Sequence, residues 1–133
     1  MAKIIFCEDE VRIQKLIRAV LRTTTHQITI VSDGGEGLEL IERERPDVIF
    51  TDISMPNYDG FQLAQTIKAR ADLAHIPIVF VTAFAQQAEI EEAYRCGATG
   101  YLVKPFSPTE LRAKIDEFAH ANGIGERNMS STG

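Results

Sequence analysis

Four groups of polar residues in the sequence could act together on an anionic ligand. One apolar run ends at Asp52, and three others are followed by Glu8-Asp9-Glu10, by Thr82-Ala83 and by Lys104-Pro105. Carboxylates gathered in one place repel one another by roughly 1 to 4 kcal/mol per pair at about 4 Å, so an ionised cluster needs a cation. A hard, all-oxygen set of ligands of this kind suits Mg²⁺.

A carboxylate, a metal ion and an ammonium group around one anion are the equipment of phosphoryl transfer, which depends on positioning and charge neutralisation. In this interpretation Asp52 is the nucleophile, and its attack on phosphorus gives an aspartyl phosphate. Lys104 balances the charge of the arriving anion, and the Thr82 hydroxyl donates a hydrogen bond to it. Taken singly, each group also has an ordinary explanation, as an acidic helix start, a strand end or a solvated lysine. Their occurrence after four separate apolar runs favours a common site.

Five short apolar runs, each followed by a helical pattern, predict the elements that position these groups. The runs cover residues 4–7, 28–31, 48–51, 78–81 and 101–103, and several are continuously apolar, as expected for strands buried on both faces. The alternation predicts an α/β fold, namely a single doubly wound (βα)5 domain of the flavodoxin-like kind. Its five-stranded parallel sheet is expected in the order 2-1-3-4-5, and sites form at the carboxyl ends of such strands. The helix at about 86–96 has few apolar anchors, which makes it a candidate for movement.

The length of 133 residues fits one domain, predicted at 1–121, and the Gly/Ser-rich residues 122–133 are expected to form a flexible tail. The N-terminal apolar run is too short for a signal peptide or a membrane span, which predicts a cytoplasmic protein without a membrane partner. The net charge of −5 argues against a nucleic-acid-binding surface. Cys7 and Cys96 lack metal-site spacing and are expected to be buried, reduced thiols.

One basic stripe runs against the acidic balance of the chain. Arg12, Lys15, Arg18 and Arg22 recur at near-helical spacing. They are either the solvated face of an amphipathic helix or a docking stripe for an acidic partner. The three histidines, His26, His75 and His120, show no metal-ligand spacing, and we interpret them as structural or surface residues.

The segments IIFCEDE, VIFTDISMPNYDG, FVTAFA and GYLVKPF resemble the receiver domain of bacterial two-component response regulators. The resemblance runs in order from about Lys3 to Ala121, and single-domain chemotaxis-type regulators are the architecture that it matches best. It implies a phosphorylation-controlled switch with no separate substrate. Asp52 would be the phosphoacceptor, supplied by a phosphohistidine on a histidine kinase or a histidine phosphotransfer protein.

The resemblance also implies a role for each remaining site residue. Asp9 would bind Mg²⁺ directly, Glu8 would bind it through water, and Ser54 would offer its backbone carbonyl as a ligand beside Asp52. Three other residues respond to the phosphoryl group: Lys104 would pair with its oxygens, Thr82 would close onto it, and the Ala83 N–H would donate to it.

The switch and the output surface follow from the same resemblance. Tyr101 occupies the aromatic switch position and would move inward when Thr82 moves. The Lys104-Pro105 bond would be cis. The face formed by the fourth helix, the fifth strand and the fifth helix would bind an output protein whose identity the sequence does not give.

Three positions depart from the family pattern or bear on its kinetics. Glu8 stands where an Asp is more usual, and its longer side chain should still reach a metal-bound water. Ser54 and Phe84 occupy positions that influence how quickly the phosphoryl group is hydrolysed, and a bulky Phe84 is expected to shield it from water.

Two other functions are alternatives to the phosphorylation-controlled switch. A haloacid-dehalogenase-type phosphatase also uses an aspartyl phosphate, but it normally carries an Asp two residues after the nucleophile, where this chain has Ser54. An interaction module that is never phosphorylated is the other alternative, and the intact set of acidic residues, Thr82 and Lys104 argues against it.

Overall fold

The computed structural model of the 133-residue chain describes residues 2–55, 57–83 and 86–121, with the backbone alone for residues 120 and 121. Five strands alternate with five helices within these ranges. In chain order they are β1 (Lys3–Cys7), α1 (Val11–Leu21), β2 (Gln27–Val31), α2 (Gly34–Glu44), β3 (Val48–Asp52), α3 (Gly60–Lys68), β4 (Ile78–Thr82), α4 (Gln87–Arg95), β5 (Gly100–Val103) and α5 (Pro108–Ala121). The predicted alternation is confirmed, whereas the tail predicted at 122–133 lies outside the described residues.

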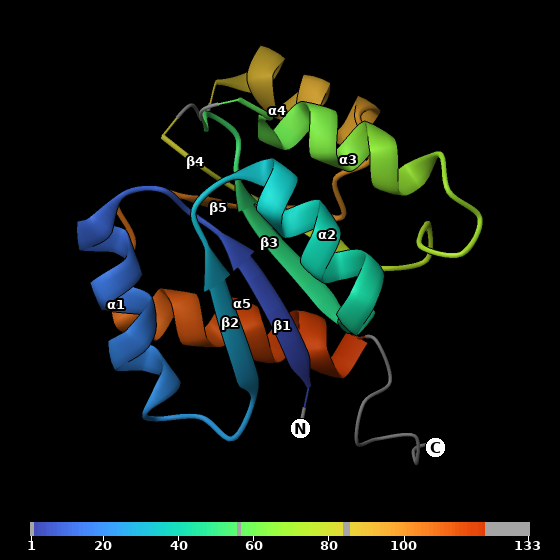
Figure 1. Cartoon of the computed structure of the whole chain (residues 1–133). Coiled ribbons are helices and arrows are strands. Elements are labelled where there is room, and N and C mark those ends of the chain that lie inside the picture. The colour runs from blue at the N-terminus through green and yellow to red at the C-terminus, as the bar shows by residue number, and fades with distance from the viewer. Residues whose placement is uncertain (1, 56, 84–85, 122–133) are drawn as a thin grey trace, which may run out of the picture.

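The strands form one parallel sheet in the order β2-β1-β3-β4-β5, as predicted (Figure 1). The carboxyl ends of β3 and β4 are in register, with Asp52 opposite Val81, and Thr82 of β4 lies opposite Val103 of β5. β2 is an edge strand, and Asp33 at its end caps α2 by accepting a hydrogen bond from the Glu36 N–H at 2.8 Å. Asp33 is therefore occupied by a structural role, away from the other strand ends.

Helices cover both faces of the sheet, and each face has its own apolar core (Figure 1). α1 and α5 pack on one face, where the rings of Phe6 and Phe50 stack with centroids 5.2 Å apart. α2, α3 and α4 pack on the other face around Ile49 and Phe80. Because the central strands are buried on both faces, each of β1, β3 and β4 contains a continuous apolar run of three or four residues.

The helices differ in how firmly they are held. α3 buries Gly60, Leu63, Ala64 and Ile67, and a capping box between Asp59 and Gln62 closes its N-terminus. α4 buries a single residue, Ala93, within its span. The expectation that the fourth helix is weakly anchored is confirmed by this difference in burial.

The prediction of buried thiols is confirmed for both cysteines. Cys7 and Cys96 are both buried and free. Over the described ranges, none of the helices has the length and apolar character needed to cross a membrane.

Candidate functional site

A cavity of about 260 Å³ opens where the carboxyl ends of β3, β4 and β5 meet the turn after β1. Its lining residues are Asp9, Glu10, Asp52, Ser54, Thr82, Ala83 and Lys104. Six of these seven were predicted as site residues or as their immediate partners, and Glu8 is buried beside them. The residues predicted at the strand ends therefore line one cavity, and their chemical roles stay predictions.

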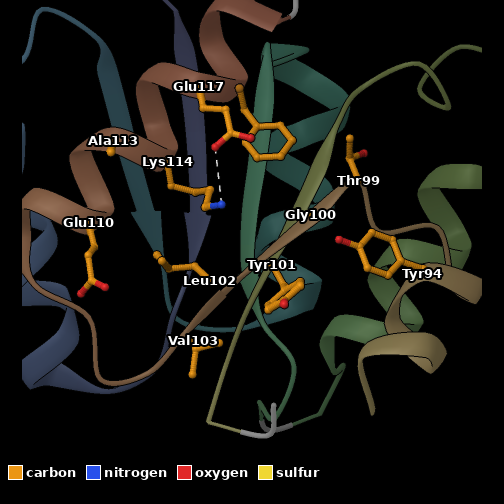
Figure 2. A pocket seen from close by; sticks show the side chains of 11 residues that line it. Tyr94, Thr99, Gly100, Tyr101, Leu102, Val103, Glu110, Ala113, Lys114 and Glu117 are labelled. Carbon is orange, nitrogen blue, oxygen red and sulfur yellow. Dashed lines mark ion pairs between the residues drawn. The ribbon is translucent and has the colours of Figure 1, made fainter. Parts of the chain in front are cut away.

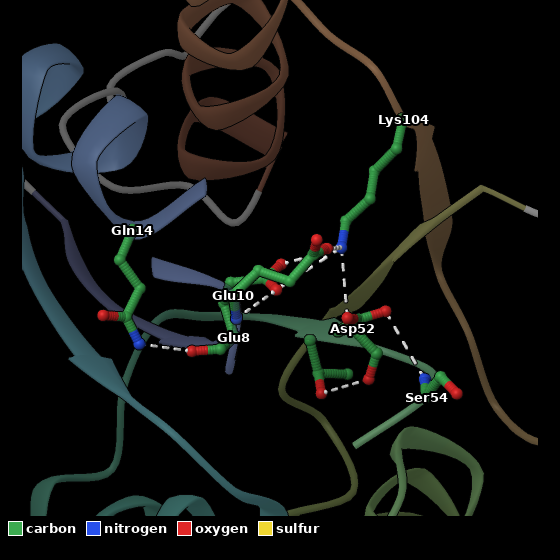
Figure 3. A network of polar contacts seen from close by, with 7 residues as sticks. Glu8, Glu10, Gln14, Asp52, Ser54 and Lys104 are labelled. Carbon is green, nitrogen blue, oxygen red and sulfur yellow. Dashed lines mark hydrogen bonds and ion pairs between the residues drawn. The ribbon is translucent and has the colours of Figure 1, made fainter. Parts of the chain in front are cut away.

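The ammonium group of Lys104 forms ion pairs with three acidic residues at the cavity (Figure 3). Its Nζ lies 3.1 Å from Glu8 Oε1, 2.9 Å from Glu10 Oε1 and 3.1 Å from Asp52 Oδ2. The peptide bond that follows, Lys104-Pro105, is cis, as the resemblance implied. The Lys104 side chain is only 11% exposed, so these ion pairs are partly shielded from water.

The charges around Lys104 shift its pKa in opposing directions. Burial lowers the pKa of the ammonium, but the hydrogen bond to Glu10 and the charges of Glu8 and Asp52 outweigh burial and raise it above its usual value. Lys104 is therefore a permanent cation at neutral pH. One cation faces three carboxyl groups, which leaves the site with an excess of acidic groups.

Glu8 is the most deeply buried acid of the site, with a side chain that is 0% exposed. Its Oε2 accepts a hydrogen bond from the Glu10 N–H at 3.1 Å, and its backbone carbonyl accepts one from the Gln14 amide at 2.6 Å. Burial raises the pKa of the Glu8 carboxyl to about 7, and the nearby charge of Asp52 adds to the rise against the opposing effects of the Glu10 N–H and Lys104. Its Oε1 makes no hydrogen bond with a described residue and meets only the charge of Lys104.

Asp52 stands at the last position of β3, where a buried strand meets the cavity. Its Oδ2 pairs with Lys104, and its Oδ1 accepts a long hydrogen bond of 3.4 Å from the Ser54 N–H. The neighbouring Thr51 hydroxyl donates to the Asp52 carbonyl at 2.9 Å and so fixes the end of the strand. These contacts leave the carboxylate oriented toward the cavity and available to an electrophile.

The donor set fits a divalent cation. Glu8, Glu10 and Asp52 each offer a carboxylate oxygen, and these three oxygens lie within 4.8 Å of one another. A hard, all-oxygen set with excess negative charge is what Mg²⁺ requires, and the buried Oε1 of Glu8 still lacks a hydrogen-bond donor. The structure therefore supports a metal site at this edge of the sheet.

The acids that the structure brings together differ in one member from the predicted set. Asp9 is exposed at the cavity and is not part of the group of three, so its role as a direct ligand stays a prediction. The Ser54 carbonyl as a ligand is likewise untested. Glu10, which belonged to the predicted acidic group but had no role of its own there, reaches Lys104 and faces Asp52 instead. The only signal in the sequence was its place in the acidic run after β1.

The predicted phosphoryl-sensing residues lie on neighbouring strands. Thr82 is buried at the end of β4, and its carbonyl accepts a hydrogen bond of 2.8 Å from the Lys104 N–H. Ala83 follows at the cavity wall. Phe84, expected to shield the phosphoryl group, lies outside the described residues.

Tyr101 lies on β5 beside a second, larger hollow rather than in the acidic cavity (Figure 2). Its half-buried ring meets the ring of Tyr94 from α4 edge to face, with centroids 6.3 Å apart. This groove of about 520 Å³ runs between α4, β5 and α5 and has Lys114 and Glu117 on one wall, 3.5 Å apart. The face predicted to bind an output protein thus carries a groove with aromatic and charged walls, and its role in output stays a prediction.

The structure also places the basic stripe and His26. Arg12, Lys15, Arg18 and Arg22 are all exposed on or directly after α1, and none of them forms an ion pair with another described residue. His26 is structural, as predicted: its Nδ1 accepts a hydrogen bond from the Ala2 N–H at 2.9 Å, and its Nε2 lies 3.1 Å from Asp116.

Comparison with known proteins assigns the family. Residues 4–116 match the response regulator receiver domain. The chain belongs to this family. As a receiver domain it is a phosphoaccepting switch of two-component signalling, a class of domain that works with histidine kinases and downstream effectors.

Three relatives show how the receiver domain compares in detail. It is 38% identical over 113 residues to the probable transcriptional regulator ycf27 of Guillardia theta, covering 85% of this chain and 43% of that protein. It is 32% identical to chemotaxis protein CheY-3 of Vibrio cholerae, covering 86% and 89%. A receiver domain of sensor histidine kinase PA1611 from Pseudomonas aeruginosa, solved with a magnesium ion coordinated in the active site cleft, superposes with a TM-score of 0.81 at 32% identity, covering 90% and 98%. This chain spans less than half the length of the ycf27 proteins that it matches.

Proposed function

We propose that Asp52 accepts a phosphoryl group from a phosphohistidine on a histidine kinase or a histidine phosphotransfer protein. The observation that carries the proposal is the Lys104 ammonium 3.1 Å from Asp52 Oδ2 in an open acidic cavity. A carboxylate at a strand end, next to a fixed cation, is placed to attack phosphorus while the cation neutralises negative charge on the phosphoryl oxygens.

In the transfer, an Asp52 oxygen forms a new bond to phosphorus as the P–N bond of the phosphohistidine breaks. The electron pair of that bond stays on the imidazole nitrogen, which leaves. Lys104 then exchanges its ion pair with Asp52 for one with the phosphoryl oxygens, and it stays charged throughout. Glu8, Asp9, Asp52 and the Ser54 carbonyl are the proposed ligands of Mg²⁺, which when bound would neutralise phosphoryl charge.

The transmission of the signal is proposed to pass through Thr82 and Tyr101 to the groove between α4, β5 and α5. The Lys104 backbone N–H donates a hydrogen bond of 2.8 Å to the Thr82 carbonyl, so a movement of either residue displaces the other. Tyr101 is half-buried against Tyr94 of α4, the helix with one buried residue in its span. Phosphorylation would bias a two-state equilibrium of these elements and change how an output protein binds the groove.

The domain is proposed to act on no substrate besides its own phosphoryl group, and to reside in the cytoplasm. A haloacid-dehalogenase-type phosphatase normally carries an Asp two residues after its nucleophile, and this chain has Ser54 at that position. Two buried free thiols suit a reducing compartment.

The test is labelling with a small phosphodonor and Mg²⁺, followed by mass spectrometry of the intact protein. We expect one added phosphoryl group that is stable in acid and labile in base, no labelling of Asp52→Ala, and no labelling after chelation of the metal. Asp33→Asn is the matched control, because Asp33 also follows a strand but lies at the sheet edge, and this variant should label normally. Unchanged labelling of Asp52→Ala would reject Asp52 as the acceptor.

A further inference from the structure

Glu10 makes an unusual contact for a residue at the start of a helix. It is the N-cap of α1, yet its side chain forms no hydrogen bond with the helix that it begins. Its carboxylate instead reaches across the cavity to Lys104 at 2.9 Å. Because the Glu10 side chain does not cap the helix, its carboxylate is available to the site.

The place of this carboxylate sets what it can influence. Glu10 lines the cavity together with Asp9 and Ser54, and its side chain remains 48% exposed. One of its oxygens lies within 4.8 Å of a carboxylate oxygen of Asp52. Any phosphodonor that reaches Asp52 therefore comes within a few ångströms of the negative charge of Glu10, and so does any cation that binds Glu8 and Asp52.

We propose that Glu10 is a positioning residue that controls, by its charge, which ions reach Asp52. It retains Lys104 until an anion arrives, slows the approach of small anionic phosphodonors and favours the binding of a divalent cation. This inference rests on the proposed role of Asp52 as phosphoacceptor, and it adds a residue that the resemblance to the family did not assign.

The size of the effect follows from Coulomb's law. In a water-like dielectric, a unit charge about 6 Å away changes a rate or an affinity about threefold for each unit of charge on the partner. Removing the charge of Glu10 should then speed attack on acetyl phosphate, a dianion at neutral pH, about tenfold, and attack on phosphoramidate, which carries mostly one net negative charge, about threefold. The same change should weaken Mg²⁺ binding about tenfold, and added salt should shrink all three effects.

The decisive variant is Glu10→Gln, which keeps the shape of the side chain and removes its charge. Glu39→Gln is the matched control, because Glu39 is exposed on α2, away from the cavity lining, and its substitution removes the same unit of charge. Labelling rates would be measured for both donors at saturating Mg²⁺, at low and high salt. Mg²⁺ affinity would be measured separately by calorimetry on the unphosphorylated protein.

We expect faster labelling of Glu10→Gln, more so with acetyl phosphate than with phosphoramidate, together with weaker Mg²⁺ binding and an unchanged control. Opposite changes in the binding of a cation and an anion are the signature of charge, since a structural defect would weaken both. Equal acceleration with the two donors, slower labelling or unchanged Mg²⁺ affinity would overturn the inference. Labelling of Asp52→Ala, or no labelling of the unmodified protein, would instead count against the proposed function.

Discussion

The buried carboxyl of Glu8 should make the stability of the domain depend on pH in a range where few other groups titrate. Burial raises its pKa from the ordinary 4.5 to about 7. Between these two values the folded protein binds more protons than the unfolded chain, so the free energy of unfolding falls as pH rises. The shift of about 2.5 pH units, at about 1.4 kcal/mol per unit, corresponds to a loss of at most about 3 kcal/mol between roughly pH 5 and pH 8.

The substitution Glu8→Gln isolates the contribution of Glu8 ionisation to the free energy of unfolding. Glutamine keeps the size of the side chain and an oxygen for the Glu10 N–H, but it cannot ionise. Urea unfolding of both proteins at several pH values, with a chelator to remove metal, gives the difference in their free energies of unfolding. That difference should move by about 2 to 3 kcal/mol in favour of the variant as pH rises from about 5 to about 8.

The same comparison of the unmodified protein with Glu8→Gln can also contradict the prediction. If the two stability curves run parallel between about pH 5 and pH 8, Glu8 does not change its protonation in that range and is not held in a desolvated site. Mg²⁺ provides a second readout: it should stabilise the unmodified protein more at about pH 8 than at about pH 5, and the Gln variant should show little of this gain.

Three further predictions follow from single contacts. Lys104→Met leaves two buried carboxyls without a cation, so the free energy of unfolding should fall by about 3 kcal/mol in urea unfolding without metal at about pH 8. Mg²⁺ should restore part of this loss. A variant that keeps its full stability without metal would contradict the ion-pair network. Gly60→Ala places a Cβ 2.5 Å from the Asp52 carbonyl oxygen, so this variant should destabilise the domain by about 1 to 3 kcal/mol and slow the labelling of Asp52. Gly35→Ala is the control: its Cβ meets only a side-chain atom at 3.3 Å, and labelling should stay unchanged. Burial raises the pKa of Cys7 to about 12, so an alkylating reagent should modify it only after unfolding in urea, and rapid alkylation of the native protein would show that the strand opens.

The strands and the residues at their ends could be predicted because two-sided burial leaves a plain signature. Each central strand contains a continuous apolar run, so Asp52 and Thr82 stand out as polar residues at the ends of buried strands. Parallel strands bring their carboxyl ends to one edge, which is why Lys104 could be placed beside Asp52 although 52 residues separate them.

The choice among Glu8, Asp9 and Glu10 could not be made in the same way. The three acids are adjacent, and their side-chain directions depend on the backbone of one turn. Glu8 still belongs to the sheet, because its N–H donates to the Val31 carbonyl at 2.9 Å, and it is buried for that reason. The chain then turns into α1, and this turn exposes Asp9 at the rim and directs Glu10 to Lys104. Side-chain direction in a turn follows from dihedral angles that composition and periodicity do not contain.

The single buried residue within α4 has a consequence for how sensitive the switch can be. A helix held by so few contacts differs little in free energy between two positions, and about 1.4 kcal/mol of preference is enough to change the ratio of two states tenfold. One or two new hydrogen bonds to a phosphoryl group are of that size. A firmly packed helix such as α3, with four buried residues, would need a much larger bias. In the proposed transmission through α4, this loose packing lets a small difference in free energy between the two forms of the receiver produce a large change in population.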